Sequence, residues 1–388
     1  MKRNSRFLAI AACALAIMVA ASSVVFGAGA AETGSFSVDA PSAFLMDAAT
    51  GTTLYEQNAR EHRPVASMVK IMTLVLAFDA VDAGELGLDE SITVSENASS
   101  MGGSQAFLDA QAEYKADDLI KAIIVASAND ACVAIAERLG GSVDAFVGDM
   151  NDRAVELGMN DTNFVNCTGL PAPNQYSCAA DAAVMFRELI GHDKYFEYSG
   201  IWMFDFEHPS GRKTMLTNTN KLIRSYEGCD GGKTGFTNEA MYCLSATAER
   251  NGTRLISVVT GAQTSKGRNA QICKLFDYGF ANYETRQVIF GGVELDAALE
   301  IPASKEKRSA VAPAENGFYL AARGSSAELT YEIAFDENIS LPVAAGSTVG
   351  KLSVFADGEL VASSPLVTST ELTVPGYLDI LGELLRSW

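Results

Sequence analysis

Three short motifs combine the residue types that nucleophilic catalysis needs: Ser67-Met68-Val69-Lys70, Ser127-Ala128-Asn129 and Lys233-Thr234-Gly235. A serine hydroxyl is a weak nucleophile at neutral pH, so a nearby base must withdraw its proton as attack begins. The chain has only 3 histidines, so the usual imidazole partner is scarce. Lys70, three residues after Ser67, is therefore the candidate base.

A lysine can act as a base only when its pKa is lowered. Burial, a second cation such as Lys233, and the positive end of a helix beginning near Ser67 would each favour the neutral amine of Lys70. The same helix end offers backbone N–H groups to an oxyanion. We predict Ser67 as the nucleophile and Lys70 as its base.

The other two motifs supply groups that hold a substrate and move its protons. Ser127 is predicted to pass a proton to the leaving amine, and Asn129 to orient the substrate amide and Lys70. Lys233 and Thr234 suit a carboxylate, through charge and a directed hydrogen bond. Gly235 is expected to let a substrate backbone lie against the strand, since it has no Cβ.

Context separates the first motif from chance matches. Ser210-Gly211-Arg212-Lys213 and Ser304-Lys305-Glu306-Lys307 have the same spacing, but both lie in polar stretches without a helical period. Pro64 instead opens a predicted helix, in which apolar residues recur at helical spacing after Ser67.

The elements around the motifs predict an α+β fold, with an antiparallel sheet flanked by helices. Further helices are expected over 116–138, with an interruption at Asn129-Asp130, and over 143–157 and 181–190, with a loop over 161–178. Strands are expected over 42–46, 53–55, 232–236, 241–248 and 253–260.

After about Tyr283 the pattern changes to short alternating apolar runs, which predict a separate, smaller all-β sandwich. The final segment, Gly376 to Trp388, places apolar residues on one face of a helix. That amphipathic helix could pack on the sandwich, pair with another copy or make peripheral membrane contact through Tyr377–Trp388. The predicted domains are a catalytic domain over 31–283, the sandwich over 284–373 and the helix over 374–388.

The first thirty residues have the pattern of a secretory signal peptide, 1–30. Lys2, Arg3 and Arg6 precede an apolar run, which ends in the small residues Ala28-Gly29-Ala30. A retained membrane anchor is the alternative, and both place the catalytic part outside the cytoplasm. The protein is therefore expected to be exported, in the cell wall or on the outer face of the cytoplasmic membrane.

Composition excludes several partners. The formal net charge of −19 argues against nucleic acid as a partner and against docking on anionic lipid.

Six cysteines follow Cys13, an even count that permits disulfides in an exported chain without requiring them. No Cys-x-x-Cys or histidine cluster has metal-ligand spacing, so neither a metal nor another cofactor is expected.

In this order and spacing, the motifs resemble those of the penicillin-binding protein and serine β-lactamase superfamily. The likeness is greatest to the low-molecular-mass D-alanyl-D-alanine carboxypeptidases. It rests on Pro64 to Lys70, Ser127 to Ala131, Asn163-Phe164 through Gly169-Leu170, and Asp230 to Thr237, and it covers nearly the whole mature chain. It implies a penicillin-binding-protein transpeptidase-like domain followed by the β-rich domain and the C-terminal helix.

The resemblance also implies a reaction. Ser67 would be acylated by the penultimate D-Ala of a peptidoglycan stem pentapeptide, the terminal D-Ala would leave, and water would release the tetrapeptide. β-Lactams would be covalent inhibitors. The implied catalytic residues are Ser67, Lys70 and Ser127, and the implied substrate-binding residues are Asn129, Lys233, Thr234, Gly235 and Phe236. The backbone N–H groups of Ser67 and Phe236 would form the oxyanion hole.

Three other functions are known for chains with related motifs or folds. A class A β-lactamase needs a glutamate in the loop between the second and third motifs, and none lies between Glu156 and Glu188. A D,D-endopeptidase or transpeptidase acting on cross-linked peptidoglycan would use the same acyl-enzyme and stays open. A non-catalytic peptidoglycan-binding protein would be expected to have lost Ser67, Lys70 or Lys233. One departure is Gly232, where the family usually has a larger apolar residue.

Overall fold

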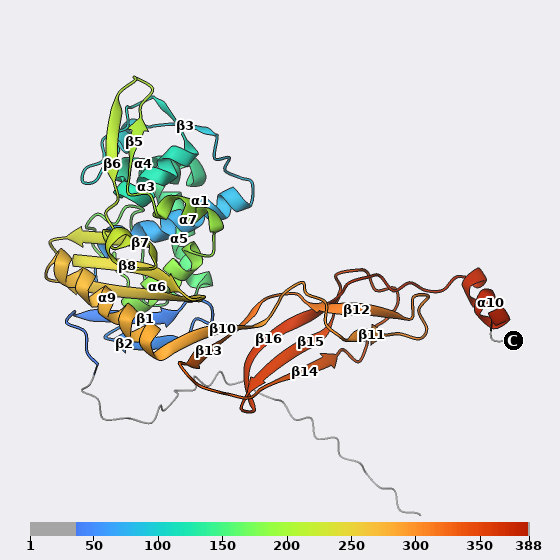
Figure 1. Cartoon of the computed structure of the whole chain (residues 1–388). Helices are drawn as coiled ribbons and strands as arrows, with labels where there is room; N and C mark the ends of the chain where they lie inside the picture. The colour runs from blue at the N-terminus through green and yellow to red at the C-terminus, as the bar shows by residue number, and fades with distance from the viewer. Residues whose placement is uncertain (1–35, 387–388) are drawn as a thin grey trace, which may run out of the picture. The chain divides into compact units, whose positions relative to one another are not determined.

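The computed structural model describes residues 36–386, so the predicted signal peptide lies outside the described residues. The N-terminal part of the described chain contains a five-stranded antiparallel sheet, with its strands in the order β2-β1-β9-β8-β7 (Figure 1). Its strands are β1 (Ser42–Asp47), β2 (Thr53–Gln57), β7 (Cys229–Thr237), β8 (Met241–Arg250) and β9 (Thr253–Ala262). All five were predicted. β7, which carries Lys233-Thr234-Gly235, is an edge strand.

Helices cover both faces of this sheet because the apolar residues of its strands point alternately to either side. Leu45 and Leu255 point toward α9 (Ser265–Asn282), whereas Phe44, Met46 and Ile256 join the core on the other face. That core is formed with α1 (Lys70–Asp82), α3 (Ala116–Ala126), α4 (Asn129–Gly140), α5 (Val143–Glu156) and α6 (Ala179–Leu189). The predicted α+β arrangement is confirmed.

Two helix predictions need correction at the motifs themselves. The first helix does not begin at Pro64: a 3-10 turn, η1 (Ala66–Val69), precedes α1, which begins at Lys70. Ala66 has a left-handed φ of 49°, so the chain turns sharply just before Ser67. The predicted helix over 116–138 is two helices, because Ser127 adopts φ 62° and ends α3. The break therefore lies before Asn129, which is the first residue of α4.

Shorter elements complete this part of the chain. Two small antiparallel sheets pair β3 (Ser91–Thr93) with β4 (Glu113–Lys115) and β5 (Met203–Glu207) with β6 (Lys213–Thr217). Three short helices are α2 (Glu96–Ser99), α7 (Asp193–Ser199) and α8 (Leu222–Ser225). The predicted loop over 161–178 contains no helix or strand, and an isolated bridge joins Asn163 to Tyr176.

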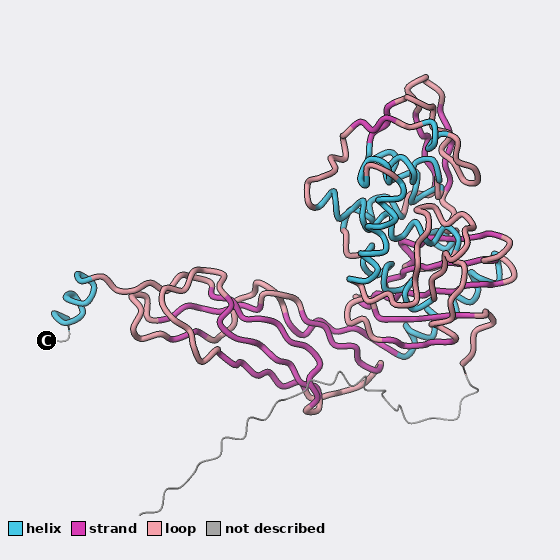
Figure 2. Tube along the Cα trace, turned by 180° about the vertical axis from the view of Figure 1, so that it is seen from behind, coloured by secondary structure: helices cyan, strands magenta, loops and turns pink. Residues whose placement is uncertain are grey.

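A second, all-β part follows (Figure 2). Five strands, β11 (Ala298–Glu300), β12 (Arg308–Pro313), β16 (Glu359–Thr368), β15 (Thr348–Ala356) and β14 (Leu329–Phe335), lie side by side in that order. A two-stranded sheet pairs β10 (Tyr283–Ile289) with β13 (Gly317–Ala322). Val311, Val354 and Leu366, on three strands of the five-stranded sheet, are fully buried in the core of this all-β part. The predicted C-terminal β domain is confirmed.

The predicted C-terminal helix is present as α10 (Tyr377–Arg386), and Trp388 lies outside the described residues. Its apolar residues are exposed, with Tyr377 at 80% and Leu378 at 79%. Asp379 and Glu383 pair with Lys305 and Lys307 at 3.5 and 2.9 Å. No helix within residues 36–386 is long and apolar enough to cross a membrane.

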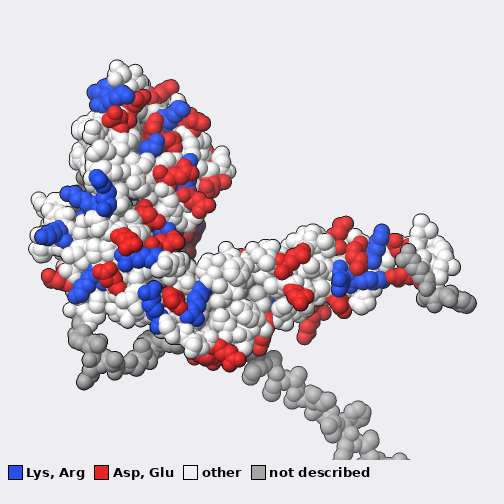
Figure 3. All heavy atoms as spheres, in the orientation of Figure 1, with Lys and Arg blue, Asp and Glu red and all other residues white. Residues whose placement is uncertain are grey.

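The six cysteines from Cys132 onward are all free thiols, and five of them are buried. The pairing that the sequence left open is therefore absent among these six. On the face shown in Figure 3, acidic side chains are distributed over the surface with lysines and arginines between them.

Candidate active site

The structure brings the predicted nucleophile and base into contact. Ser67 lies in η1 and Lys70 begins α1, so their side chains share one side of the turn. Lys70 Nζ donates to Ser67 Oγ at 3.2 Å and to the carbonyl of Thr168, and the Lys70 side chain is fully buried. Thr168, which the sequence analysis did not single out, therefore aims the amine at the serine.

The environment of Lys70 favours a neutral amine. Burial lowers the pKa of Lys70, while the Cys132 and Cys167 thiols and the Asp130 carboxylate partly oppose that effect. The Cys132 thiol also donates to the Cys167 carbonyl at 3.0 Å beneath the site. Since a neutral amine has a lone pair to accept a proton, the direction of this shift suits a base.

A second lysine–serine pair faces the first. Lys233, on β7, is buried and donates to Ser127 Oγ at 2.8 Å. The left-handed turn at Ser127, between α3 and α4, places the hydroxyl there. The pKa of Lys233 lies well below its ordinary value, first because of burial and then because of the Lys70 charge. The two lysines therefore compete for protons, as two like charges in one buried site must.

Asn129 offers an unsatisfied acceptor at the site. Its side-chain amide donates to the Gly102 carbonyl at 2.6 Å, whereas its buried Oδ1 has no hydrogen-bond partner among the described residues. The next residue, Asp130, holds the adjoining loop by accepting from the backbone N–H groups of Ala106 and Leu108, each at 3.0 Å. A buried acceptor without a partner is costly, which suits a group that awaits a substrate N–H.

At Gly235, β7 packs so closely against the turn that carries Ser67 that a larger residue would not fit. A Cβ there would lie 2.4 Å from the Val65 carbonyl oxygen and 3.3 Å from the Ser67 nitrogen. A second reason for glycine at this position is therefore that β7 approaches η1 closely, and its expected role in admitting substrate backbone stays a prediction. Gly169 meets the same turn from the other side, since a Cβ there would lie 2.0 Å from the Ala66 carbonyl oxygen.

The remaining predicted residues lie along the same strand. Thr234 is buried, at 9% exposure. Phe236 is 49% exposed, and its ring is tilted by 35° to that of Tyr242 with ring centroids 4.4 Å apart. At Gly232, a Cβ would lie 2.6 Å from Asn220 Nδ2. Asn220 therefore fills the space that a larger residue would need, and its amide bonds to the Gly231 carbonyl at 3.2 Å.

One buried cation was missed by the sequence analysis. Arg268, on α9, is 4% exposed and has no carboxylate partner among residues 36–386. Its guanidinium donates to the carbonyl of Cys243 at 3.4 Å, directly behind Gly235 in the strand register. Burial lowers the pKa of Arg268 to about 10. A lone arginine in a polar stretch gave no sequence signal.

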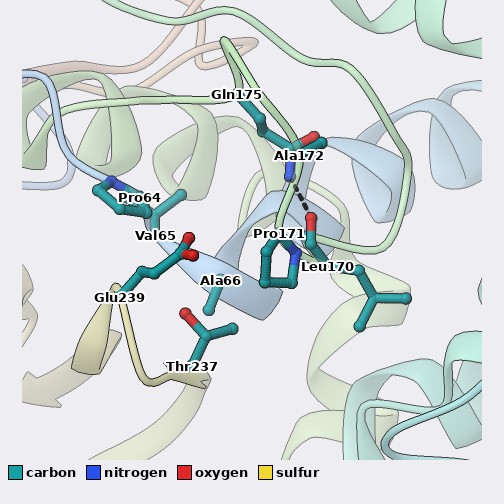
Figure 4. A pocket seen from close by; sticks show the side chains of 10 residues that line it. Pro64, Val65, Ala66, Leu170, Pro171, Ala172, Gln175, Thr237 and Glu239 are labelled. Carbon is teal, nitrogen blue, oxygen red and sulfur yellow. Dashed lines mark hydrogen bonds between the residues drawn. The ribbon is translucent and has the colours of Figure 1, made fainter.

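A hollow of about 170 Å³ adjoins the turn that carries Ser67 (Figure 4). Its walls include Ala66, Leu170, Gln175, Thr237 and Glu239, and we call it the Glu239 hollow. Gln175 Nε2 donates to the Leu170 carbonyl at 3.0 Å, which closes the loop on one side.

Comparison with known proteins places this geometry in a family. The D-alanyl-D-alanine carboxypeptidase family matches residues 28–264, and the C-terminal domain of penicillin-binding protein 5 matches residues 283–373. The D-alanyl-D-alanine carboxypeptidase DacF of Bacillus subtilis is 37% identical over 358 residues, covering 92% of each chain. DacA of Haemophilus influenzae is 33% identical, covering 88% of this chain and 86% of that protein.

Solved structures give the same result. Penicillin-binding protein 5 of Haemophilus influenzae matches with a TM-score of 0.72 at 31% identity, over 88% of this chain and 99% of that one. Penicillin-binding protein 6B of Escherichia coli matches with a TM-score of 0.67 at 29% identity, over 87% and 97%. The chain therefore belongs to the D-alanyl-D-alanine carboxypeptidase family, with a penicillin-binding-protein transpeptidase-like domain followed by a C-terminal β domain.

Proposed function

We propose that the protein is a serine-type D-Ala-D-Ala carboxypeptidase, which removes the terminal D-Ala from peptidoglycan stem pentapeptides through an acyl-enzyme on Ser67. The observation that carries this proposal is the contact of the buried Lys70 amine with Ser67 Oγ at 3.2 Å. Family membership supports the substrate class, because the matched relatives are named for this activity.

In the acylation step, Ser67 Oγ attacks the carbonyl carbon of the penultimate D-Ala while its proton passes to Lys70 Nζ. The oxyanion that forms accepts from the backbone N–H groups of Ser67 and Phe236. Losing one such donor costs about 3 kcal/mol of transition-state stabilisation. The close approach of β7 to η1 at Gly235 supports this pairing of donors, since a Cβ there would lie 3.3 Å from the Ser67 nitrogen.

The C–N bond then breaks, and the leaving amine needs a proton. Ser127 supplies it and is reprotonated through Lys233, whose amine is 2.8 Å away. Lys233 and Thr234 also hold the carboxylate of the terminal D-Ala, and the charge of Arg268 behind the strand adds to the attraction. Asn129 Oδ1 accepts from a substrate amide. Water then hydrolyses the ester, which frees the tetrapeptide and Ser67.

Intact mass spectrometry with benzylpenicillin tests this proposal. The mature protein should gain a lasting penicilloyl adduct, and Ser67→Ala should gain none. Intact drug without an adduct would instead support the non-catalytic peptidoglycan-binding alternative. Rapid hydrolysis of the drug would mean that the protein is a β-lactamase despite the missing glutamate.

Cross-linked substrate tests the remaining alternative. The endopeptidase or transpeptidase interpretation requires the same acyl-enzyme to form from a cross-linked peptide or to react with an amine. We expect release of D-Ala from a pentapeptide to be faster than cleavage of a cross-linked dimer, measured by chromatography of the products. The reverse order would assign the protein to cross-link cleavage.

The setting of this activity is also part of the proposal. We infer that residues 1–30 are removed on export, that 31–283 and 284–373 are the two domains, and that the enzyme acts outside the cytoplasm, where stem peptides are found. No metal or other cofactor takes part in the steps above.

A further inference from the structure

The Glu239 hollow has features of a binding site that the catalytic steps do not use. Glu239 is the one charged residue that lines it, and Figure 4 shows its carboxylate directed across the opening toward Val65. Among residues 36–386 this carboxylate has no hydrogen-bond or ion-pair partner, and its surroundings are otherwise apolar or neutral. The volume of about 170 Å³ is roughly ten times the 10–15 Å³ that one water molecule needs.

The position of the hollow along β7 indicates which part of a substrate would reach it. β7 is an edge strand, so an extended peptide can lie against its open side. Thr234 and Phe236 are two residues apart, or about 7 Å along a strand. With the terminal D-Ala carboxylate at Thr234 and the scissile carbonyl at Phe236, the residue before the two D-Ala residues arrives near Thr237, where the hollow opens.

We propose that the Glu239 hollow binds the cationic side chain of the stem-peptide residue that precedes D-Ala-D-Ala, through a charge interaction with Glu239. This inference rests on the proposed function, because it takes the direction of the bound peptide from the catalytic steps. The walls formed by Leu170 and Val65 suit an aliphatic stem, and the Glu239 carboxylate suits an ammonium at its end. The site favours a stem whose side-chain amine is free over one whose amine is acylated.

Three matched peptides measure this selectivity through kcat/KM for D-Ala release. They are Nα-acetyl-L-Lys-D-Ala-D-Ala, its Nε-acetyl derivative and the norleucine analogue. We expect the wild-type protein to prefer the free amine by about threefold to fivefold, as suits a partly exposed charge pair, and to lose part of that preference at high salt. Glu239→Gln should reduce the ratio to about one, and Glu239→Lys should reverse it.

Glu300→Gln is the matched control, because Glu300 is an exposed carboxylate on β11 outside the site, and it should keep the wild-type ratio. Acylation by benzylpenicillin shows that each variant has an assembled active site. Equal kcat/KM for the three peptides in the wild type would overturn the inference about the Glu239 hollow but not the proposed function. An unchanged preference for the free amine in Glu239→Gln would have the same meaning. Failure of the wild type to release D-Ala from any peptide would overturn the proposed function as well.

Discussion

At the scale of residues, the site contains two buried lysines, and each of them contacts a different serine. Lys70 meets Ser67, which lies in the tight turn between Gly169 and Gly235, whereas Lys233 meets Ser127 across the site. Neither amine has a carboxylate within ion-pair distance among the described residues, so both pKa values fall with burial. The site therefore concentrates amines that can exchange protons.

Replacing Lys70 by arginine tests its role as a base. Arginine keeps the positive charge but cannot lose its proton at accessible pH. We expect Lys70→Arg to slow acylation by benzylpenicillin by about 10²- to 10⁴-fold, the usual contribution of a general base. Lys266→Arg, an exposed lysine-to-arginine change on α9, should leave the rate at the wild-type level. Near-normal acylation of a folded Lys70→Arg protein would exclude Lys70 as the base.

The lowered pKa of Lys233 makes a prediction about stability and pH. Between its folded and unfolded pKa values, the unfolded state binds the extra proton, so stability rises with pH until about 10.4, the unfolded value. Urea unfolding of wild type and Lys233→Met should therefore show the wild type gaining relative stability from pH 7 to 9. Groups away from this pair, such as Cys178 and Cys229 with their raised pKa values, contribute equally to both proteins and cancel in the difference. A difference that is independent of pH would contradict the assignment.

At the scale of elements, the site depends on how closely one edge strand meets one helical turn. Gly235→Ala would force a Cβ to 2.4 Å from the Val65 carbonyl and push β7 away from η1. We expect a loss of about 1–3 kcal/mol of unfolding free energy, as for other overpacked sites, together with a larger fractional loss of acylation rate. Thermal unfolding and intact mass with benzylpenicillin measure the two effects.

Gly148→Ala is the matched control for that experiment. Nothing lies within 4 Å of a Cβ at Gly148, which is on α5 away from the site. Because alanine also favours a helix over glycine, this variant should be as stable as the wild type or more so. If Gly235→Ala behaved like Gly148→Ala, the spacing between β7 and η1 would not control the site.

The same elements show what the sequence could predict. The strands β8 and β9 could be predicted because their apolar runs are long and bounded by turn residues. β7 has no such run, and the Lys233-Thr234-Gly235 motif beside β8 indicated it instead. The break at Ser127 was predicted two residues too late and the turn at Ala66 was not predicted, since neither residue type normally takes a left-handed conformation. Thr168 and Arg268 were missed because a carbonyl and a lone arginine act only through tertiary contacts.

At the scale of the whole molecule, α10 presents an exposed apolar face that the rest of the described chain does not cover. The helix also carries Asp379 and Glu383, so anionic lipid should not attract it. We expect weak sedimentation of the mature protein with phosphatidylcholine vesicles, without a gain from added phosphatidylglycerol, and loss of that binding when Tyr377–Trp388 is deleted. If nearly all of the protein sedimented with the vesicles, α10 would be a stronger membrane anchor than we expect. If deleting Tyr377–Trp388 left the sedimented fraction unchanged, α10 would not make the membrane contact.

The position of β7 at an open sheet edge also affects which other chains can pair with it. An unpaired strand edge normally invites pairing with any extended chain, including other copies of the protein. Here η1 lies close to β7 at Gly235, and Asn220 occupies the space beside Gly232, so the strand is tightly packed at both glycines. A short, flexible peptide tail can adapt to such a packed strand more easily than a whole sheet can. We therefore expect copies of the protein not to associate edge to edge through β7, in spite of its unpaired edge.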